Sequence, residues 1–278
     1  MDEFSSASCG GIPGISDTFG AAMWSVDYGL QLASVGYSGA YLHTRERGVT
    51  YNLFDPPAGV AAGAGAWTTN PTFYAYLPTS EALQGTNGSK VVDLNIQNSA
   101  TDKSQSIAGY AIYDASTNNV HHLVFFNFAN ATGGPVDFTI PSTFITPSAA
   151  SSVSVRYLTA PNVNEKFDIA WGNQTWLNVG DAVPVTATSS HVQADQNIAC
   201  AQGCTVSVPG PAVAVVYVGG FDALVSANSS SSSSGGSNST KTGSPSTNTH
   251  ASGASLAAHA TGLTAFLGGV AAIAFALL

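Results

Sequence analysis

A carboxylate near the start of the chain stands where it could do chemistry. Glu3 lies in "MDEF", directly before a loop of Ser, Cys, Gly and Pro residues that ends at a helix signal. Retaining hydrolysis of a glycosidic bond needs two carboxyl groups about 5 Å apart, one as nucleophile and one as acid/base. In a (β/α)8 barrel such groups lie at the carboxyl ends of strands. Glu3 fits the end of such a strand, although a loose, polar chain start explains the stretch as well.

Other residues that could bind a metal or a sugar fit structural roles better. His121 and His122 are neighbours in a predicted strand, so we expect their side chains to alternate and not to share a metal. Trp67, Trp171 and Trp176 could form a sugar-stacking face, but core packing is the commoner use of such aromatic residues. The sequence has no G-x-S-x-G, phosphate-binding loop or H-E-x-x-H motif. We therefore expect no metal and no cofactor.

The elements that would position Glu3 are predicted from helical and buried runs. A helix is expected over 17–34, with Ser16 or Asp17 as its cap, because apolar residues recur there at helical spacing. A buried strand, "GAYLHT", follows at 39–44.

A second predicted helix completes this part of the chain. It follows a long Gly/Pro-rich loop and covers 71–84; Pro71 suits its first turn, and Pro78 should kink or interrupt it. Loop, helix, strand, loop and helix together indicate the closing portion of an α/β unit over 1–85.

The pattern changes after Gly85 to short strand-like runs separated by Asn, Gly, Ser and Pro. About eight such runs predict an antiparallel β-sandwich over 86–222, with a hairpin turn at "DASTNN". They are "VVDLNIQ", "IAGYAIYD", "VHHLVFFNF", "VDFTI", "SVSVRYL", "VPVTAT", "CTVSV" and "AVAVVYVG".

Composition points to a polar but weakly ionic surface. Only 8% of the 278 residues are charged, against roughly 25% in an average soluble domain, while 44% are hydrophobic. The 16 acids outnumber the 7 bases and no basic stripe is present, so a nucleic-acid partner is not expected.

Cysteines and glycosylation sequons fit a secreted chain. Cys200 and Cys204, in "CAQGC", could close a small disulfide loop, whereas Cys9 is either a free thiol or has its partner elsewhere. Five N-x-[ST] acceptor sites favour secretion without requiring it. They begin at Asn87, Asn130, Asn173, Asn228 and Asn238.

The last part of the chain has the pattern of a cell-surface anchor signal. Residues 223–255 form a Ser/Asn-rich stretch that is predicted to be a disordered stalk, and 256–278 form an apolar tail without a following Lys or Arg. A GPI-attachment signal fits best, with Ser252 or Gly253 as the attachment residue; a tail-anchored helix is the alternative. We expect a cell-surface or extracellular, GPI-anchored protein.

Under that interpretation the two ends of the sequence lead to conflicting predictions about the secretory pathway. A GPI signal serves a chain that has entered the secretory pathway, yet residues 1–20 have neither the basic region nor the apolar run of a signal peptide. The expectation is that the true N-terminus is missing.

A long string around Glu3 resembles a known family. The stretches "EFSSASCGGIPGISDTFGAAMWSVDYGLQLA", "GAYLHTRERGVTYNLFDPP" and "YAYLPTSEALQG" are similar to the latter part of fungal β-glucuronidases of glycoside hydrolase family 79. The similarity runs from Asp2 to about Gly219. It implies an α+β fold in which the C-terminal fragment of a (β/α)8 barrel precedes an antiparallel β-sandwich, to which family members also lend a segment from before the barrel.

The resemblance also implies roles for three residues. Glu3 takes the position of the nucleophile at the end of the seventh barrel strand, which forms a covalent glycosyl intermediate. The backbone around Gly10 and the phenol of Tyr51 are the nearest matches to the groups that hold the glucuronate carboxylate. Tyr51 could equally be a half-buried loop aromatic.

One catalytic residue has no counterpart. The family's acid/base Glu ends the fourth strand, upstream of the part that this chain resembles, and a nucleophile without its acid loses about 10²- to 10⁴-fold in rate. Glu46, Glu81 and Glu165 receive no role: Glu46 could line the cleft, Glu81 is expected on a helix surface, and Glu165 belongs to the sandwich.

The sequence thus predicts part of a retaining β-glucuronidase-like enzyme that removes glucuronic acid from glycans and is inactive on its own. The alternative is a non-catalytic cell-surface β-sandwich protein that binds or displays carbohydrate. A structural wall protein without a sugar site is the third hypothesis.

Overall fold

The structure is a computed structural model of the chain. It describes residues 3–56, 67–85, 88–102, 104–130, 133–145, 152–177 and 183–221. The predicted stalk, the apolar tail and the two candidate attachment residues Ser252 and Gly253 lie outside these ranges, as do the sequons at Asn87, Asn228 and Asn238. Within the described ranges, no helix has the length and apolar character needed to cross a bilayer.

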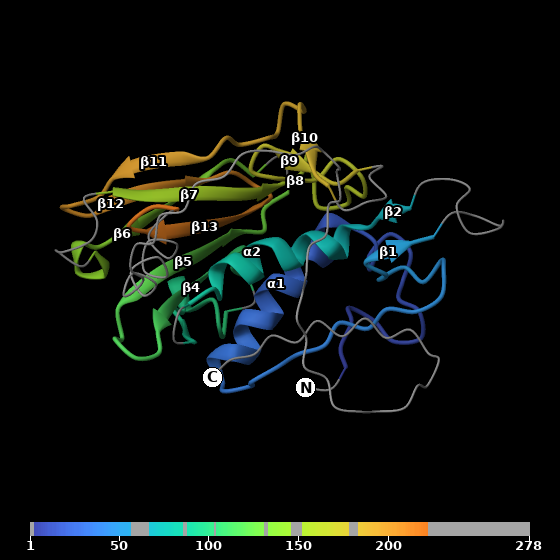
Figure 1. Cartoon of the computed structure of the whole chain (residues 1–278), viewed down its shortest axis with the longest axis horizontal. Coiled ribbons are helices and arrows are strands. Elements are labelled where there is room, and N and C mark those ends of the chain that lie inside the picture. The colour runs from blue at the N-terminus through green and yellow to red at the C-terminus, as the bar shows by residue number, and fades with distance from the viewer. Residues whose placement is uncertain are drawn as a thin grey trace, which may run out of the picture.

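One large antiparallel sheet dominates the fold (Figure 1). Its strands run in the order β10-β9-β8-β7-β13-β5-β4-β3, and β11 also pairs with β7. β13 and most of β5 are buried on both faces, which explains why these two runs are almost continuously apolar in sequence. The strands are β3 (Ser89–Asp93), β4 (Ile107–Asp114), β5 (Val120–Asn127), β7 (Ser152–Thr159), β8 (Ala170–Trp171), β9 (Gln174–Thr175), β10 (Val185–Thr186), β11 (Gln196–Ala199) and β13 (Ala212–Val218).

A second, two-stranded sheet covers one face of the large sheet. It consists of β6 (Val136–Ile140) and β12 (Cys204–Val208), paired antiparallel with Phe138 opposite Val206. Their inward side chains join an apolar cluster with residues of β4, β5, β7 and β13. The predicted antiparallel β fold is therefore confirmed, and the "DASTNN" turn joins β4 to β5 as expected.

Two helices cover the opposite face of the large sheet. They are α1 (Phe19–Ser34) and α2 (Tyr76–Ala82), which continues a 3-10 helix, η1 (Pro71–Ala75). Figure 1 shows both helices lying along the sheet beside β4 and β5. Phe19, Met23 and Leu30 of α1 are fully buried in the cluster that this contact forms. The large sheet is thus the middle of three layers.

The cap predicted for the first helix is wrong. The helix begins at Phe19, and neither Ser16 nor Asp17 caps it. Ser16 Oγ accepts from the Ile12 N–H at 2.9 Å, and Asp17 pairs with Lys166 at 2.6 Å. The first N–H groups of α1 instead donate to carbonyls of the loop after β7, Phe19 to Glu165 at 2.7 Å and Gly20 to Val163 at 2.8 Å. The β-domain therefore satisfies this helix end, which local sequence cannot reveal.

The remaining local predictions hold in part. The strand expected over 39–44 is only an isolated parallel bridge between Phe4 and Leu42, so the buried run is present but the regular strand is not. The helix expected over 71–84 is present as η1 and α2. Pro78 lies in the first turn of α2, where its missing N–H costs nothing.

Four further short segments complete the description. β1 (Phe54–Asp55) pairs with β2 (Thr68–Thr69), and single 3-10 turns lie at Ile96–Asn98 and Ser142–Phe144.

Candidate functional site

The backbone brings Glu3 and His43 to neighbouring chain segments. Phe4 pairs with Leu42 in a parallel bridge, with the Phe4 N–H donating to Tyr41 O at 2.9 Å and the His43 N–H donating to Phe4 O at 3.1 Å. Phe4 and Leu42 are buried against the helices. Because side chains alternate along extended segments, Glu3 and His43 point to the opposite face.

His43 links the predicted nucleophile to Tyr51. His43 Nδ1 lies 3.3 Å from Glu3 Oε1 and 3.1 Å from the Tyr51 hydroxyl oxygen. The side chain of Glu3 is 66% exposed, whereas that of His43 is 23% exposed and Tyr51 is buried. The structure therefore brings two of the three residues predicted from sequence together around a histidine.

These side chains line an open hollow of about 540 Å³. Among the described residues that line it, Glu3 is the only carboxylate. Arg45 and Tyr51 also line it and can donate hydrogen bonds, so the hollow suits an anionic ligand although the whole chain has a net charge of −9. Its lining consists of Glu3, Phe4, Ser5, Ala7, Ser8, Cys9, His43, Arg45 and Tyr51.

The loop after Glu3 is fixed by Thr50. Gly10 O accepts from the Thr50 N–H at 3.0 Å and from Thr50 Oγ1 at 2.8 Å. Gly11 has a φ of +79°, and a Cβ there would overlap Thr50 Oγ1, so only glycine permits this approach. The Gly10 carbonyl is thus engaged within the protein, and the preceding residue, Cys9, lines the hollow.

A buried asparagine organises the loop that carries Tyr51. Asn52 Oδ1 accepts from the Arg45 N–H at 2.8 Å and from Thr44 Oγ1 at 3.1 Å. Its Nδ2 donates to Glu46 O at 2.9 Å and to Asp55 Oδ1 at 3.0 Å. Asn52 is fully buried, so these four bonds hold 44–55 in one conformation beside the hollow.

Two of the other glutamates have clear partners. Glu46 pairs with Arg45 at 3.1 Å on the surface. Glu165 Oε1 accepts from three backbone N–H groups in its own turn, those of Lys166, Phe167 and Asp168. These bonds, that from Phe167 first, lower the pKa of Glu165. Neither residue lines the hollow.

The expectation that Glu81 is a helix surface acid is wrong. Glu81 lies on the side of α2 that faces the sheet and accepts from Arg156, Trp171 Nε1 and the Tyr217 hydroxyl. Arg156 in turn pairs with Asp195 at 2.7 Å. This carboxylate therefore joins α2 to three strands and is not part of the hollow.

The expected alternation of His121 and His122 is also wrong. The pairing of β4 with β5 shifts register between Ile112 and Tyr113, which pair with His122 and Val120, so His121 is an extra residue in a bulge. The two rings consequently lie together, with their Nδ1 atoms 2.6 Å apart. In the described part of the chain no group of three or more His, Cys, Asp or Glu residues could hold a metal ion.

The remaining predicted residues occupy ordinary structural positions. Cys200 and Cys204 form a disulfide bond, and Cys9 is an exposed free thiol. Trp171 and Trp176 are buried in the core between helices and sheet, while Trp67 is 46% exposed. The described sequon residues Asn130 and Asn173 are exposed.

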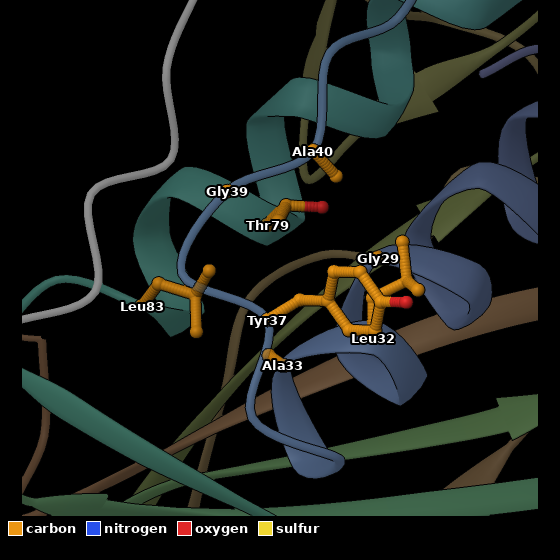
Figure 2. Close-up of a pocket in the computed structure, with 8 residues that line it drawn as sticks. All are labelled: Gly29, Leu32, Ala33, Tyr37, Gly39, Ala40, Thr79 and Leu83. Carbon is orange, nitrogen blue, oxygen red and sulfur yellow. The ribbon is translucent and has the colours of Figure 1, made fainter. Parts of the chain in front are cut away.

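A second hollow, between α1 and α2, is too small for a sugar. It measures about 20 Å³, room for about one water molecule. Figure 2 shows its lining, in which Leu32, Tyr37 and Leu83 surround the space and no side chain is charged.

No functional role was predicted from the sequence for His43, Arg45 or Asn52. His43 is the second-last residue of the predicted buried run at 39–44 and Arg45 follows that run directly; polar residues at the end of such a run are where a barrel places its site. That position was the available signal for His43 and Arg45. No sequence signal pointed to Asn52, because its four hydrogen-bond partners are set by the loop conformation.

Comparison with known proteins identifies the β-domain. Residues 109–215 match the family model of the glycosyl hydrolase family 79 C-terminal beta domain. A curated β-glucuronidase from Aspergillus niger is 31% identical over 171 residues, which cover 58% of this chain and 30% of that protein.

A solved structure shares the fold. A 4-O-α-L-rhamnosyl-β-D-glucuronidase from Fusarium oxysporum 12S is 22% identical, with a TM-score of 0.55 over 77% of this chain and 42% of that one. The chain spans less than half the length of either relative.

Proposed function

We propose, from the premise that residues 109–215 are a C-terminal beta domain of glycoside hydrolase family 79, that this chain carries the nucleophile part of a retaining β-glucuronidase site. The predicted resemblance to that family is confirmed, and the relatives are glycoside hydrolases. The further step to a catalytic role rests on the hollow in which Glu3, His43 and Tyr51 meet. In this proposal 1–85 are the last part of a (β/α)8 barrel and 86–222 are the β-sandwich.

Glu3 would attack the anomeric carbon of a β-glucuronide. Its carboxylate reaches into an open hollow, as an attacking group must, and the C–O bond that forms gives a glycosyl ester while the aglycone leaves. The aglycone oxygen of an ordinary glycoside needs a proton as it leaves, and no second carboxylate lines the hollow within the part of the chain that the structure describes. We therefore propose that the acid/base comes from polypeptide outside this chain and that the chain alone does not turn over ordinary glucuronides.

The substrate proposed is a glycan that contains glucuronic acid. Tyr51 and Arg45 line the same hollow as Glu3 and can donate to a sugar carboxylate. A charged donor opposite a carboxylate is worth more than a neutral one, which favours a uronic acid over a neutral sugar.

A covalent trap tests the nucleophile without the acid. In 2-deoxy-2-fluoro-β-glucuronyl fluoride, the fluoride leaves unprotonated as the carboxylate oxygen bonds to the anomeric carbon. We expect mass spectrometry to find the 2-fluoroglucuronyl group on the peptide that contains Glu3, and no label in Glu3→Gln or with the matching glucosyl fluoride. Labelling at another residue would contradict the assignment of Glu3 as nucleophile, and turnover of methyl β-D-glucuronide that Glu3→Gln abolishes would contradict the missing acid/base.

The second candidate is a non-catalytic cell-surface protein that binds or displays carbohydrate. The described residues of the hollow include a single carboxylate, which favours this candidate, since binding needs no acid. Glucuronide binding that survives in Glu3→Gln, without labelling of the native chain, distinguishes it from the enzyme proposal.

The cellular location proposed is the outer face of the cell membrane through a GPI anchor at Ser252 or Gly253. It rests on the composition of 223–255 and 256–278. Release of the protein from intact cells by a phosphatidylinositol-specific phospholipase C, and loss of surface display when 256–278 are deleted, would support it.

A further inference from the structure

One ring nitrogen in the candidate site faces two oxygen atoms. His43 Nδ1 lies 3.3 Å from a carboxylate oxygen of Glu3 and 3.1 Å from the hydroxyl oxygen of Tyr51. The two rings are inclined at 40° with centroids 5.7 Å apart, so the contact with Tyr51 is made edge to edge rather than by stacking. The backbone N–H of His43 donates to the backbone carbonyl of Phe4, the residue next to Glu3, and this bond holds His43 in place.

The proton on this nitrogen can be assigned by chemistry. An ionised carboxylate only accepts hydrogen bonds, so a lone pair on Nδ1 would face another lone pair and repel Glu3. The arrangement is favourable when Nδ1 carries the proton. Its N–H then donates to the Tyr51 oxygen at 3.1 Å, and the positive end of this N–H group lies near the Glu3 carboxylate, whose Oε1 is 3.3 Å from Nδ1.

The consequence concerns Tyr51. A phenol whose oxygen accepts from His43 cannot use its own proton in the same bond. In the described ranges the Tyr51 hydroxyl has no other hydrogen-bond partner, and it lines the hollow with Arg45. That proton is therefore available to a ligand in the hollow.

We propose that His43 is a positioning residue for both groups: its Nδ1–H orients the Glu3 carboxylate and directs the Tyr51 O–H toward the carboxylate of a uronic acid bound in the hollow. The ligand part of this inference rests on the proposed function. His43 contacts neither the reacting bond nor the sugar in this scheme. It acts on specificity, because in the opposite tautomer the Tyr51 hydroxyl would donate to Nδ1. Tyr51 would then present only an oxygen lone pair to the anion.

The tautomer is tested on the full chain by two-bond ¹H–¹⁵N correlation spectra of the histidine rings at a pH where they are neutral. The His43 signals are identified by their loss in His43→Leu. We expect the Nδ1–H form in the native chain and in Tyr51→Phe. In Glu3→Ala the ring should change to the Nε2–H form, because Tyr51 then donates to Nδ1.

The ligand part is tested by titrating methyl β-D-glucuronide and methyl β-D-glucoside into the same proteins. Tyr51→Phe and His43→Leu should each bind the glucuronide roughly tenfold more weakly, the loss of about one hydrogen bond to a charged group, with no change for the glucoside. His43→Asn, whose amide N–H replaces the Nδ1–H donor, should restore most of that affinity. Asn173→Ala, an exposed amide, is the control, and unchanged amide spectra of the β-domain show that each variant folds.

The two experiments separate this inference from the proposed function. An Nε2–H form of His43 in the native chain, or a tautomer that does not respond to Glu3→Ala, overturns the inference even if glucuronide binds. An Nδ1–H form together with equal binding of glucuronide and glucoside supports the proton assignment but overturns both the ligand part and the proposed function. Failure of His43→Asn to restore binding overturns the positioning role.

Discussion

Glu81 Oε2 and Arg156 Nη1 lie 3.0 Å apart and join α2 to β7 across the boundary between the helices and the sheet. The contact is extended on both sides, because Trp171 Nε1 donates to the same carboxylate at 2.8 Å and Asp195 pairs with the same guanidinium at 2.7 Å. Arg156 also lies over the ring of Phe221, 4.7 Å from its centroid. Helices and β-domain are therefore linked by a charge network as well as by apolar packing.

Replacing Glu81 by Gln should destabilise the fold. The variant removes the charge that Arg156 faces, and it replaces one of the two oxygens that accept from Trp171 and Tyr217 with an NH₂ donor. We expect a loss of roughly 2–3 kcal/mol in the free energy of unfolding, below the value for a fully buried pair because about a third of each side chain reaches water. Urea unfolding measures it. Glu46→Gln, which breaks the exposed pair with Arg45, is the control and should cost less than 1 kcal/mol; equal losses would refute the assignment.

The strands show which parts of the fold can be predicted from the sequence. The long apolar runs of β4, β5, β7 and β13 could be read directly, because burial on one or both faces leaves a pattern in the chain itself. β8 and β9 have two residues each and carry no such pattern.

What the sequence could not show depends on partners distant along the chain. Glu81 lies 75 residues from Arg156, and its spacing on α2 fits a solvent face equally well. The cap of α1 comes from carbonyls near Glu165, and the bulge at His121 is visible only against β4. In the candidate site, the string around Glu3 pointed to a nucleophile, whereas His43 emerged only from the parallel bridge of Phe4 with Leu42.

A partly buried carboxylate on α1, that of Asp27, should weaken the fold as pH rises. Burial raises the pKa of Asp27, an effect that the hydrogen bond from the Tyr110 hydroxyl, at 2.7 Å, partly opposes and the charge of Asp93 reinforces. The folded state therefore holds its proton to higher pH than the unfolded chain. The stability contribution is complete below the unfolded pKa of 3.8 and is lost as pH rises through the folded value.

Asp27→Asn tests this effect. The amide oxygen can still accept from Tyr110 but carries no charge, so the variant should match the native chain in acid and become the more stable of the two as pH increases toward 7. Urea midpoints at several pH values give the comparison. A constant difference across the pH range would mean that the charge of Asp27 has no part in it.

His122 should have the opposite pH dependence. Burial, with a smaller effect of His121, lowers its pKa to about 3. The unfolded chain takes up a proton near pH 6.5 while the folded state does not, so stability is complete above pH 6.5 and falls as pH drops toward 3. The loss amounts to about 5 kcal/mol at most. His122→Gln should flatten the curve of unfolding free energy against pH between 4 and 6.5, and an unchanged slope would contradict the assignment.

Asn52 should matter more for the site than for the β-domain. Its four hydrogen bonds lie within 44–55, the loop that holds Arg45 and Tyr51 beside Glu3. Asn52→Ala leaves buried groups without partners and should free this loop, at a cost of about 1–3 kcal/mol. We expect the rate of covalent labelling at Glu3 by the fluoroglucuronyl fluoride to fall at least tenfold, while hydrogen exchange in β5 and β13 stays slow. Asn173→Ala, an exposed amide far along the chain, should change neither quantity. If Asn52→Ala labels as fast as the native chain, the loop is held by Asp55 and Thr50 without it.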